Sequence, residues 1–447
     1  MEGPAAVSQT QTEAGGPAAN EPAAAGAATQ TPATQGPAAG GALAGSPAAG
    51  RRPAGGSGAA GPAAGVPDLL YSEAETELRA AVRALLADRA AWRDVLARTE
   101  TSEPYDTGLW RALAADVGCA GLIVPEAQGG AGASYREAAV VAEELGRAVA
   151  PVPYLGSAIV ATTALLSVGG APQLLEAVAG GTQTAALAVP FATTPGARPQ
   201  PTVRVGAAHD GDPAGSYRLS GSVTGLADAL PADVLLVPAD GVPYGLYLVQ
   251  ADEAGLTRTP VVSLDATRQL ADLTFDDVPA RQIAAGAAAE QAVAAALAGG
   301  AAMLASEQLG VAERCLEMTV GYVKERRQFA RPVGSFQAIK HRLADLWVAV
   351  TQARAAARYA AACLATGDPD APVAVALAKA ACSDAAVKAG QETVQLHGGI
   401  GFTWEHPAHL YLKRAKSASI GFGTADRHRA ALAGLANLPA PPAGGAR

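Results

Sequence analysis

Cysteine is scarce in this chain, which argues against a disulfide-rich domain and against a zinc-binding domain. The 447 residues contain four cysteines and no Cys-x-x-Cys pair. The cysteines are Cys119, Cys315, Cys363 and Cys382. Because they are scattered through segments with helical periodicity, we expect buried, reduced thiols of a cytosolic protein, and neither a disulfide framework nor a zinc site.

Charge is also sparse, and no long basic run occurs. Charged residues make up 17% of the chain and the net charge is −8, which argues against nucleic acid as the main ligand. No apolar stretch of about 18 residues is free of charge and glycine, so the sequence predicts no membrane span. Glu2 stands where a secretory signal would be basic, and no apolar segment follows it. We therefore expect a cytoplasmic protein.

Two nucleotide-binding motifs are absent from the sequence. There is no G-x-x-x-x-G-K-[ST] segment, and no G-x-G-x-x-G lies between a predicted strand and a predicted helix. These absences argue against a doubly wound dinucleotide-binding fold.

Both ends of the chain have a biased composition. Residues 1–66 are almost entirely Ala, Gly, Pro, Thr, Gln and Ser, and residues 438–447 are rich in Pro, Gly and Ala. Such segments lack the large apolar side chains that would offset the entropy lost on ordering, so both are predicted to be disordered tails.

The residues between these tails fall into three segments. In residues 67–180 apolar residues recur every three or four positions, and Ser134 and Glu137 have capping-box spacing at the start of one helix. Residues 181–283 contain short β-rich runs separated by Gly, Pro and Asp, which predict an antiparallel β domain. Residues 284–437 return to long amphipathic stretches and predict a helical bundle. The expected fold class is α+β with segregated domains.

Two C-terminal stretches carry specific motifs. "YVKERRQFARPVGSFQAIKHRLADL" (322–346) and "QLHGGIGFTWEHPAHLYLKRAK" (395–416) closely resemble signatures of the acyl-CoA dehydrogenase family. Softer similarities, such as "GLIVPEAQGGAG" and "LSGSVTGLADALPADVLLVPA", extend the match to about residues 67–435. The resemblance implies an N-terminal helical domain, a β domain and a C-terminal four-helix bundle, assembled as tetramers around FAD. It also implies α,β-dehydrogenation of an acyl-CoA thioester, with electron-transfer flavoprotein or another protein as acceptor.

In this family each flavin lies between two subunits, and the neighbouring subunit contributes an R-x-x-F motif, a downstream Gln and a Q-x-x-G-G loop. The resemblance therefore assigns FAD contacts to Arg326, Phe329, Gln337, Gln395, Gly398, Gly399 and Thr424. A guanidinium suits a phosphate, and paired glycines let the backbone approach a cofactor closely. A surface salt bridge at Arg326 and a plain helix end at the glycines are the alternatives.

The substrate side of the site departs from the family pattern. The family's usual base is a Glu directly before Gly-Thr, and the aligned residue here is Phe422. A second branch carries its Glu on the long bundle helix, where this chain has Gly300. The family's T-E-P-x-x-G-S-D segment aligns with "VPFATTPGARPQP" (189–201), which has neither the acidic residues nor the serine. Loss of a general base typically costs about 10²–10⁴-fold in rate.

A relocated base is one alternative. Asp426 follows Phe422 closely and is the weak candidate, with His428 just beyond it. Glu307 and Glu313 lie on the predicted bundle helix, where structural ion pairs are the expected role.

Metal chemistry is not expected from this sequence. His406 and His409 form an H-x-x-H pattern, but apart from Glu405 no carboxylate or cysteine stands at ligand spacing.

The pattern resembles the non-catalytic subunit of heteromeric bacterial acyl-CoA dehydrogenases, which act on steroid side chains and other bulky acyl-CoA substrates. The leading hypothesis that this resemblance implies is a subunit that completes the FAD pocket of a homologous, catalytic partner in a heterotetramer and takes part in fatty acid or steroid side-chain β-oxidation. The alternatives are a self-sufficient dehydrogenase that uses Asp426 and a flavin-free scaffold or acyl-CoA-binding module.

Overall fold

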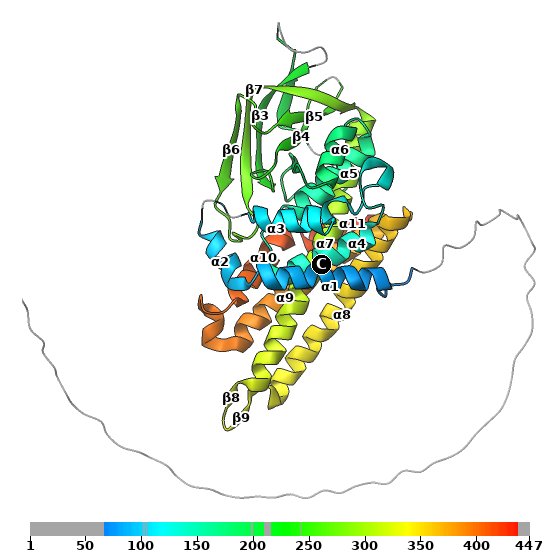
Figure 1. The fold of residues 1–447 in the computed structure, drawn as a ribbon. Coiled ribbons are helices and arrows are strands. Elements are labelled where there is room, and N and C mark those ends of the chain that lie inside the picture. The colour runs from blue at the N-terminus through cyan, green and yellow to red at the C-terminus, as the bar shows by residue number, and fades with distance from the viewer. Residues whose placement is uncertain are drawn as a thin grey trace, which may run out of the picture. The chain divides into compact units, whose positions relative to one another are not determined.

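The computed structural model describes residues 67–101, 103, 105–197, 200–209, 216–241 and 243–436. The segments predicted as tails, 1–66 and 438–447, lie outside the described residues. The predicted order of helices, β sheet and helical bundle is confirmed in the part that is described (Figure 1).

The N-terminal segment is helical, and side-chain caps define where its two main helices begin. At the start of α1 (Glu73–Arg89), Ser72 and Glu75 form a capping box. The predicted box of Ser134 and Glu137 opens α4 (Tyr135–Ala148) and satisfies backbone donors that a helix start leaves free. The other helices of this segment are α2 (Trp92–Thr99), α3 (Thr107–Arg111), α5 (Thr162–Val168) and α6 (Pro172–Ala179), with a π-helical segment at Tyr154–Ala161.

The middle segment forms one seven-stranded sheet in the order β1-β4-β5-β7-β3-β2, with β6 paired to β7. Its strands are β1 (Ala185–Leu187), β2 (Val203–Gly206), β3 (Ser216–Ala227), β4 (Val234–Ala239), β5 (Gly245–Gln250), β6 (Leu256–Val261) and β7 (Leu270–Ala285). The prediction of an antiparallel domain needs one correction, because β1 pairs with β4 in parallel. Alternation cannot reveal strand direction, since parallel and antiparallel strands share a two-residue side-chain period.

The C-terminal segment is a bundle of long helices. It comprises α7 (Ala287–Glu325), α8 (Gln337–Thr366), α9 (Ala371–His397), α10 (Ala408–Ile420) and α11 (Ala425–Leu435). The helices α7, α8 and α9 pack against one another, α10 lies on α7 and α9, and α11 lies on α9. A short hairpin of β8 (Arg327–Gln328) and β9 (Arg331–Pro332) joins α7 to α8 at the end farthest from the sheet (Figure 1).

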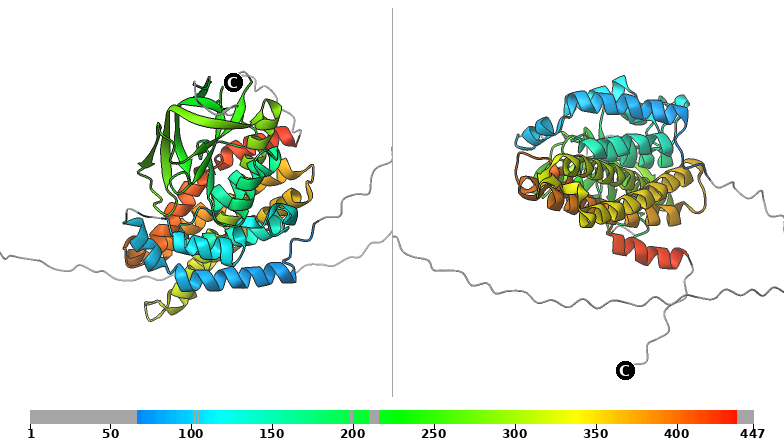
Figure 2. Two further views of the ribbon diagram at one scale, coloured as in Figure 1. Left: turned by 45° about the horizontal axis from the view of Figure 1, so that its top comes forward. Right: turned by 90° about the horizontal axis from the view of Figure 1, so that it is seen from below.

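The helix α7 connects the bundle to the N-terminal segment. Figure 2 shows α1, α4 and the bundle helices in successive layers, and α4 packs on both α1 and α7. A methyl group at Gly310 of α7 would lie 1.8 Å from the carbonyl oxygen of Glu143, and one at Gly146 would lie 2.0 Å from that of Glu307. Both positions therefore require glycine.

By length and composition, α7 is the one helix in the described part of the chain that could cross a membrane. Most of its apolar window is buried inside the fold, as in the core helix of a bundle. The four cysteines are buried and unpaired, as the sequence predicts.

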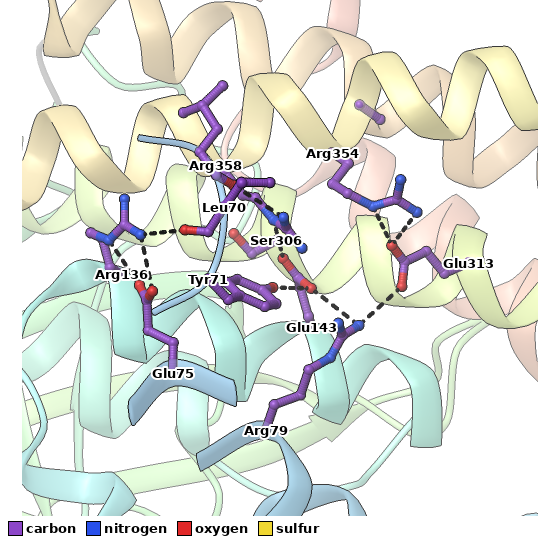
Figure 3. A network of polar contacts seen from close by, with 12 residues as sticks. Leu70, Tyr71, Glu75, Arg79, Arg136, Glu143, Ser306, Glu313, Arg354 and Arg358 are labelled. Carbon is purple, nitrogen blue, oxygen red and sulfur yellow. Dashed lines mark hydrogen bonds and ion pairs between the residues drawn. The ribbon is translucent and has the colours of Figure 1, made fainter. Parts of the chain in front are cut away.

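A buried polar network fastens α1 to the rest of the fold (Figure 3). The hydroxyl of Tyr71 donates to a Glu143 carboxylate oxygen at 2.5 Å, and Arg79 lies 3.7 Å from the same carboxylate. Arg358 of α8 covers the Tyr71 ring at 3.7 Å. Burial, assisted by the negative charge of Glu313, raises the pKa of Glu143 to about 7.

This shift predicts a pH dependence of stability. A carboxyl group with a raised pKa in the fold stabilises at low pH, and that contribution is lost as pH rises from its ordinary pKa towards about 7. We expect Glu143→Gln to gain stability relative to the wild type over this range, by up to about 1.4 kcal/mol per pH unit. Urea unfolding at about pH 5 and about pH 8 measures this difference.

The control variant is Glu317→Gln. Arg147 lowers the pKa of Glu317 although partial burial opposes the shift, so this variant should not gain stability as pH rises. If the relative stability of Glu143→Gln did not change with pH, Arg79 and Arg358 would be holding Glu143 ionised.

Candidate functional site

The two positions at which the family carries its base lie in contact in this fold. Gly300 is on α7, and Phe422 is in the short loop between α10 and α11. A methyl group at Gly300 would lie 2.7 Å from Cζ of Phe422 and 2.8 Å from Cγ2 of Val160. The phenyl ring of Phe422 therefore fills the space above Gly300, and neither position supplies a carboxylate.

Aromatic packing closes this space further. The rings of Phe191 and Phe422 meet edge to face with centroids 5.4 Å apart, a favourable geometry for aromatic pairs. Phe191 belongs to the stretch that aligns with the family's acidic T-E-P segment, so an apolar ring stands where that segment lines flavin and acyl chain. The Arg268 guanidinium lies 5.3 Å from the Phe191 ring centroid.

The cavity left beside these rings measures about 20 Å³, which is room for about one water molecule. It is lined by Leu155, Gly156, Val160, Leu187, Val189, Phe191, Ala227, Asp228 and Phe422. Neither an acyl chain nor a flavin ring fits into a space of this size. The space between Gly300, Phe191 and Phe422 is therefore filled by this chain's own side chains, while a separate cavity of about 190 Å³ lies beside Pro190 and Gln200.

Asp228 is the carboxylate in that lining, and the sequence analysis missed it. One oxygen accepts from the Tyr105 hydroxyl at 2.8 Å and the other from the Gly156 amide at 2.9 Å. Burial raises the pKa of Asp228, although the nearby charge of Arg268 opposes this shift. A single acidic residue inside the apolar run "LADAL" was the available signal. With both oxygens engaged, Asp228 holds the N-terminal segment against the sheet.

Glu307 forms a buried ion cluster next to this cavity. Its carboxylate accepts from Arg268 at 2.5 Å and from Arg414 at 2.7 Å. Burial alone would raise the pKa of Glu307, but these two guanidiniums lower it. The structural role expected for Glu307 is therefore confirmed. Glu313 also forms ion pairs, with Arg354 at 2.8 Å among others.

Asp426 does not face the closed cavity. It lies in the first turn of α11, its side chain is 94% exposed, and it pairs with Arg429 at 3.1 Å. His428 is buried, and its Nε2 lies 2.8 Å from the Phe422 carbonyl oxygen. The geometry gives no support to Asp426 as a relocated base and makes His428 a support of the loop.

The predicted FAD contacts gather at the opposite end of the bundle. Arg326, Phe329 and Gln337 surround the hairpin between α7 and α8, while Gln395, Gly398 and Gly399 end α9; all six are exposed. Tyr322 of α7 and His397 of α9 stack with ring centroids 4.4 Å apart. This stacking brings the two motifs side by side.

The chemistry of this end suits a diphosphate. Arg326 is an exposed cation at the end of α7. No atom lies within 4 Å of a methyl group built on Gly398 or Gly399, so the backbone is open to a ligand. Thr424 does not join this group, because its hydroxyl accepts from the Arg427 amide at the start of α11, beside Phe422.

The histidines near this end pack against other rings in tilted and edge-to-face geometry. His397 and His406 have ring centroids 4.2 Å apart, and His409 meets Trp404 at 4.6 Å. Burial, with the neighbouring histidines, lowers the pKa of His406 to about 4. Within the ranges described, no three His, Cys, Asp or Glu side chains gather in a way that could hold a metal ion.

Comparison with known proteins decides the family. Residues 72–177 match "Acyl-CoA dehydrogenase, N-terminal domain", and residues 290–434 match "Acyl-CoA dehydrogenase, C-terminal domain". The chain belongs to the acyl-CoA dehydrogenase family. Acyl-CoA dehydrogenase members are FAD-dependent oxidoreductases, so the predicted family, fold and cofactor are confirmed.

Several relatives are similar over almost their whole length. Acyl-CoA dehydrogenase IpdE2 of Mycobacterium tuberculosis is 36% identical over 78% of this chain and 92% of its own, and IpdE2 of Mycolicibacterium smegmatis is 37% identical over 78% and 94%. Among solved structures, a variant of the Tcur3481-Tcur3483 steroid ACAD has a TM-score of 0.71 and 33% identity over 82% of this chain and 98% of its own. The ChsE4-ChsE5 complex from Mycobacterium tuberculosis has a TM-score of 0.73 and 28% identity over 83% and 100%.

The contact between Gly300 and Phe422 predicts a coupled pair of substitutions. Gly300→Ala should destabilise the fold by about 1–3 kcal/mol, because its methyl group overpacks the ring of Phe422 and Val160. In a Phe422→Ala background the same substitution should cost less, since the methyl group then meets Val160 but no longer the ring. Urea unfolding of the four proteins measures the coupling.

Gly321→Ala is the matched control on the same helix. Nothing lies within 4 Å of its added methyl group, so it should stabilise α7 by about 0.5–1 kcal/mol. Additive effects of Gly300→Ala and Phe422→Ala would show that the ring does not occupy this space.

Proposed function

We propose that this chain is the non-catalytic subunit of a heteromeric acyl-CoA dehydrogenase and completes the FAD site of a homologous, catalytic partner. The observation that carries the proposal is the ring of Phe422, which packs directly on Gly300. Both base positions of the family thus lack a carboxylate, and the space between Gly300, Phe191 and Phe422 is filled. The open end with Arg326 and the two exposed glycines supports a role toward a neighbour's cofactor.

Exposed apolar residues near that end support assembly. Trp347 and Val348 of α8 are 58% and 46% exposed, and Phe329 of the hairpin is 87% exposed. Phe402 and Trp404, which follow the Gly398-Gly399 turn, are also largely exposed. Clustered exposed apolar side chains mark interaction surfaces. We infer that the partner covers this side of the bundle and contributes the Glu and the complete flavin-lining segment.

Two similar structures are named as pairs of unlike subunits, ChsE4-ChsE5 and Tcur3481-Tcur3483, and the second is described as a steroid ACAD. These names support a heterotetramer as the assembly and a bulky, steroid-derived acyl-CoA as the substrate class. Electron-transfer flavoprotein or another protein as electron acceptor remains a prediction, as does a cytoplasmic location.

Co-expression with a homologous subunit that carries Glu before its Gly-Thr tests the proposal. We expect about one FAD for each pair of unlike subunits, and acyl-CoA turnover by the complex. The isolated chain should bind no flavin, since its own pocket is closed. Tight FAD binding and turnover by the chain alone would favour a self-sufficient enzyme, and a complex without flavin would favour a scaffold.

A single substitution in this chain should weaken FAD binding in the complex. Arg326→Ala removes the cation expected to meet the pyrophosphate, so we expect FAD to bind about tenfold or more weakly, the worth of one charge-assisted hydrogen bond. Flavin absorbance after dialysis measures retention. Arg93→Ala, an exposed arginine on α2, is the control and should leave retention unchanged. Equal FAD retention in both variants would place the cofactor elsewhere.

A further inference from the structure

Backbone groups of the loop that carries Phe422 form hydrogen bonds with other residues of the same chain. The Phe422 amide donates to the Phe191 carbonyl oxygen at 2.7 Å, and the Phe422 carbonyl oxygen lies 2.8 Å from Nε2 of His428. The Gly423 amide donates to the Ile420 carbonyl oxygen at 3.1 Å. These polar groups therefore need neither a cofactor nor a partner chain.

Lys379 supports the same loop from α9. It is completely buried, and its Nζ donates to the Ser383 hydroxyl at 2.9 Å, to the Ala418 carbonyl oxygen at 3.0 Å and to the Gly423 carbonyl oxygen at 3.4 Å. A buried ammonium group is costly unless it is paired, and all three of these acceptors are neutral. Burial accordingly lowers the pKa of Lys379 to about 7.

The backbone of Phe422 needs such support. Its φ is +51°, in the left-handed region that a bulky residue rarely adopts. A residue kept there persists only where its surroundings over-determine the conformation. The edge-to-face contact with Phe191 holds the ring, but fixing the backbone requires the hydrogen bonds on both sides of it.

We propose that Lys379 and His428 are positioning residues that latch Phe422 over Gly300, so that internal hydrogen bonds keep this chain's own acyl pocket shut. The latch joins α9, α10 and α11 around one loop. It acts in the isolated chain as well as in a complex, and it does not depend on the proposed partner. The ring of Phe422 fills the pocket, and moving this ring out of the pocket in the wild type requires these bonds to break.

Amide hydrogen exchange tests the latch in the full-length chain. Lys379→Met keeps the length of the side chain but removes the donor, whereas Lys379→Gln keeps a donor. In Lys379→Met we expect amides of residues 420–424 to exchange about tenfold or more faster, because the loop can then open without breaking the hydrogen bonds that Lys379 donates. In Lys379→Gln the rate should stay within about threefold of the wild type, while the α4 amides stay unchanged in both.

Two further variants keep this experiment decisive. Leu86→Ala removes a buried side chain of α1, away from the loop, and should not accelerate exchange at 420–424 beyond the rest of the chain. His428→Leu breaks the other half of the latch and replaces Lys379→Met if that variant does not fold. Wild-type exchange rates at 420–424 in either latch variant, or the same acceleration in Leu86→Ala, would overturn the proposal.

Binding of benzene provides an independent readout of the closed pocket. The remaining cavity of about 20 Å³ beside Phe422 is too small for benzene, so any benzene-dependent rise in the thermal midpoint of the wild type must come from other cavities, such as the one of about 190 Å³ beside Pro190 and Gln200. Phe422→Ala should show a larger rise, since an apolar cavity replaces the ring, and Lys379→Met should show an intermediate one. Equal rises in the wild type and in both variants would contradict a pocket that is held shut by this loop.

Discussion

Close backbone contact along α7 is the constraint on which the rest of this structure depends. Gly310 lets the carbonyl of Glu143 reach the α7 backbone, and Gly300 leaves room for the Phe422 ring. The first contact fixes α4 on the bundle, and the second fixes the loop between α10 and α11. In a closely packed interior an added methyl group forces the neighbouring side chains to shift. The position of the closed pocket therefore depends on the glycines of α7.

Two buried carboxylates near α7 have different electrostatic surroundings. On the side of α1 and α4, Glu143 lies among arginines and beside another carboxylate, and burial dominates its pKa. Beside the closed pocket, Glu307 lies between Arg268 and Arg414 and remains ionised. Breaking a buried pair strands a charge and costs far more than the pair itself contributes. The Glu307 cluster thus fixes the loop between β6 and β7 against α7 and α10.

Much of the fold was predictable, because local patterns determine it. Ser134 and Glu137 form the predicted helix cap. Alignment with the family motifs places Phe422 and Gly300 at the two positions where the family carries its catalytic base. Their mutual contact was not predictable, since it joins positions far apart in the sequence. Lys379 lies in an alanine-rich stretch whose pattern gives no sign that its amine is buried. Asp228 and the parallel pairing of β1 with β4 also depend on tertiary packing, which a single sequence does not display.

The two ends of the bundle explain why these features occur together. A pocket that has lost its base gains nothing by staying open, and open apolar space destabilises a core. Packing Phe191 and Phe422 into that space removes this penalty and stiffens the domain. The hairpin end has the opposite character, because exposed apolar rings and an unshielded backbone are costly in a free subunit. Selection for stability of the isolated chain would favour filling one end and covering the other. In this chain the pocket is filled but the hairpin end is exposed. This asymmetry is expected of a subunit whose exposed end is covered by a partner.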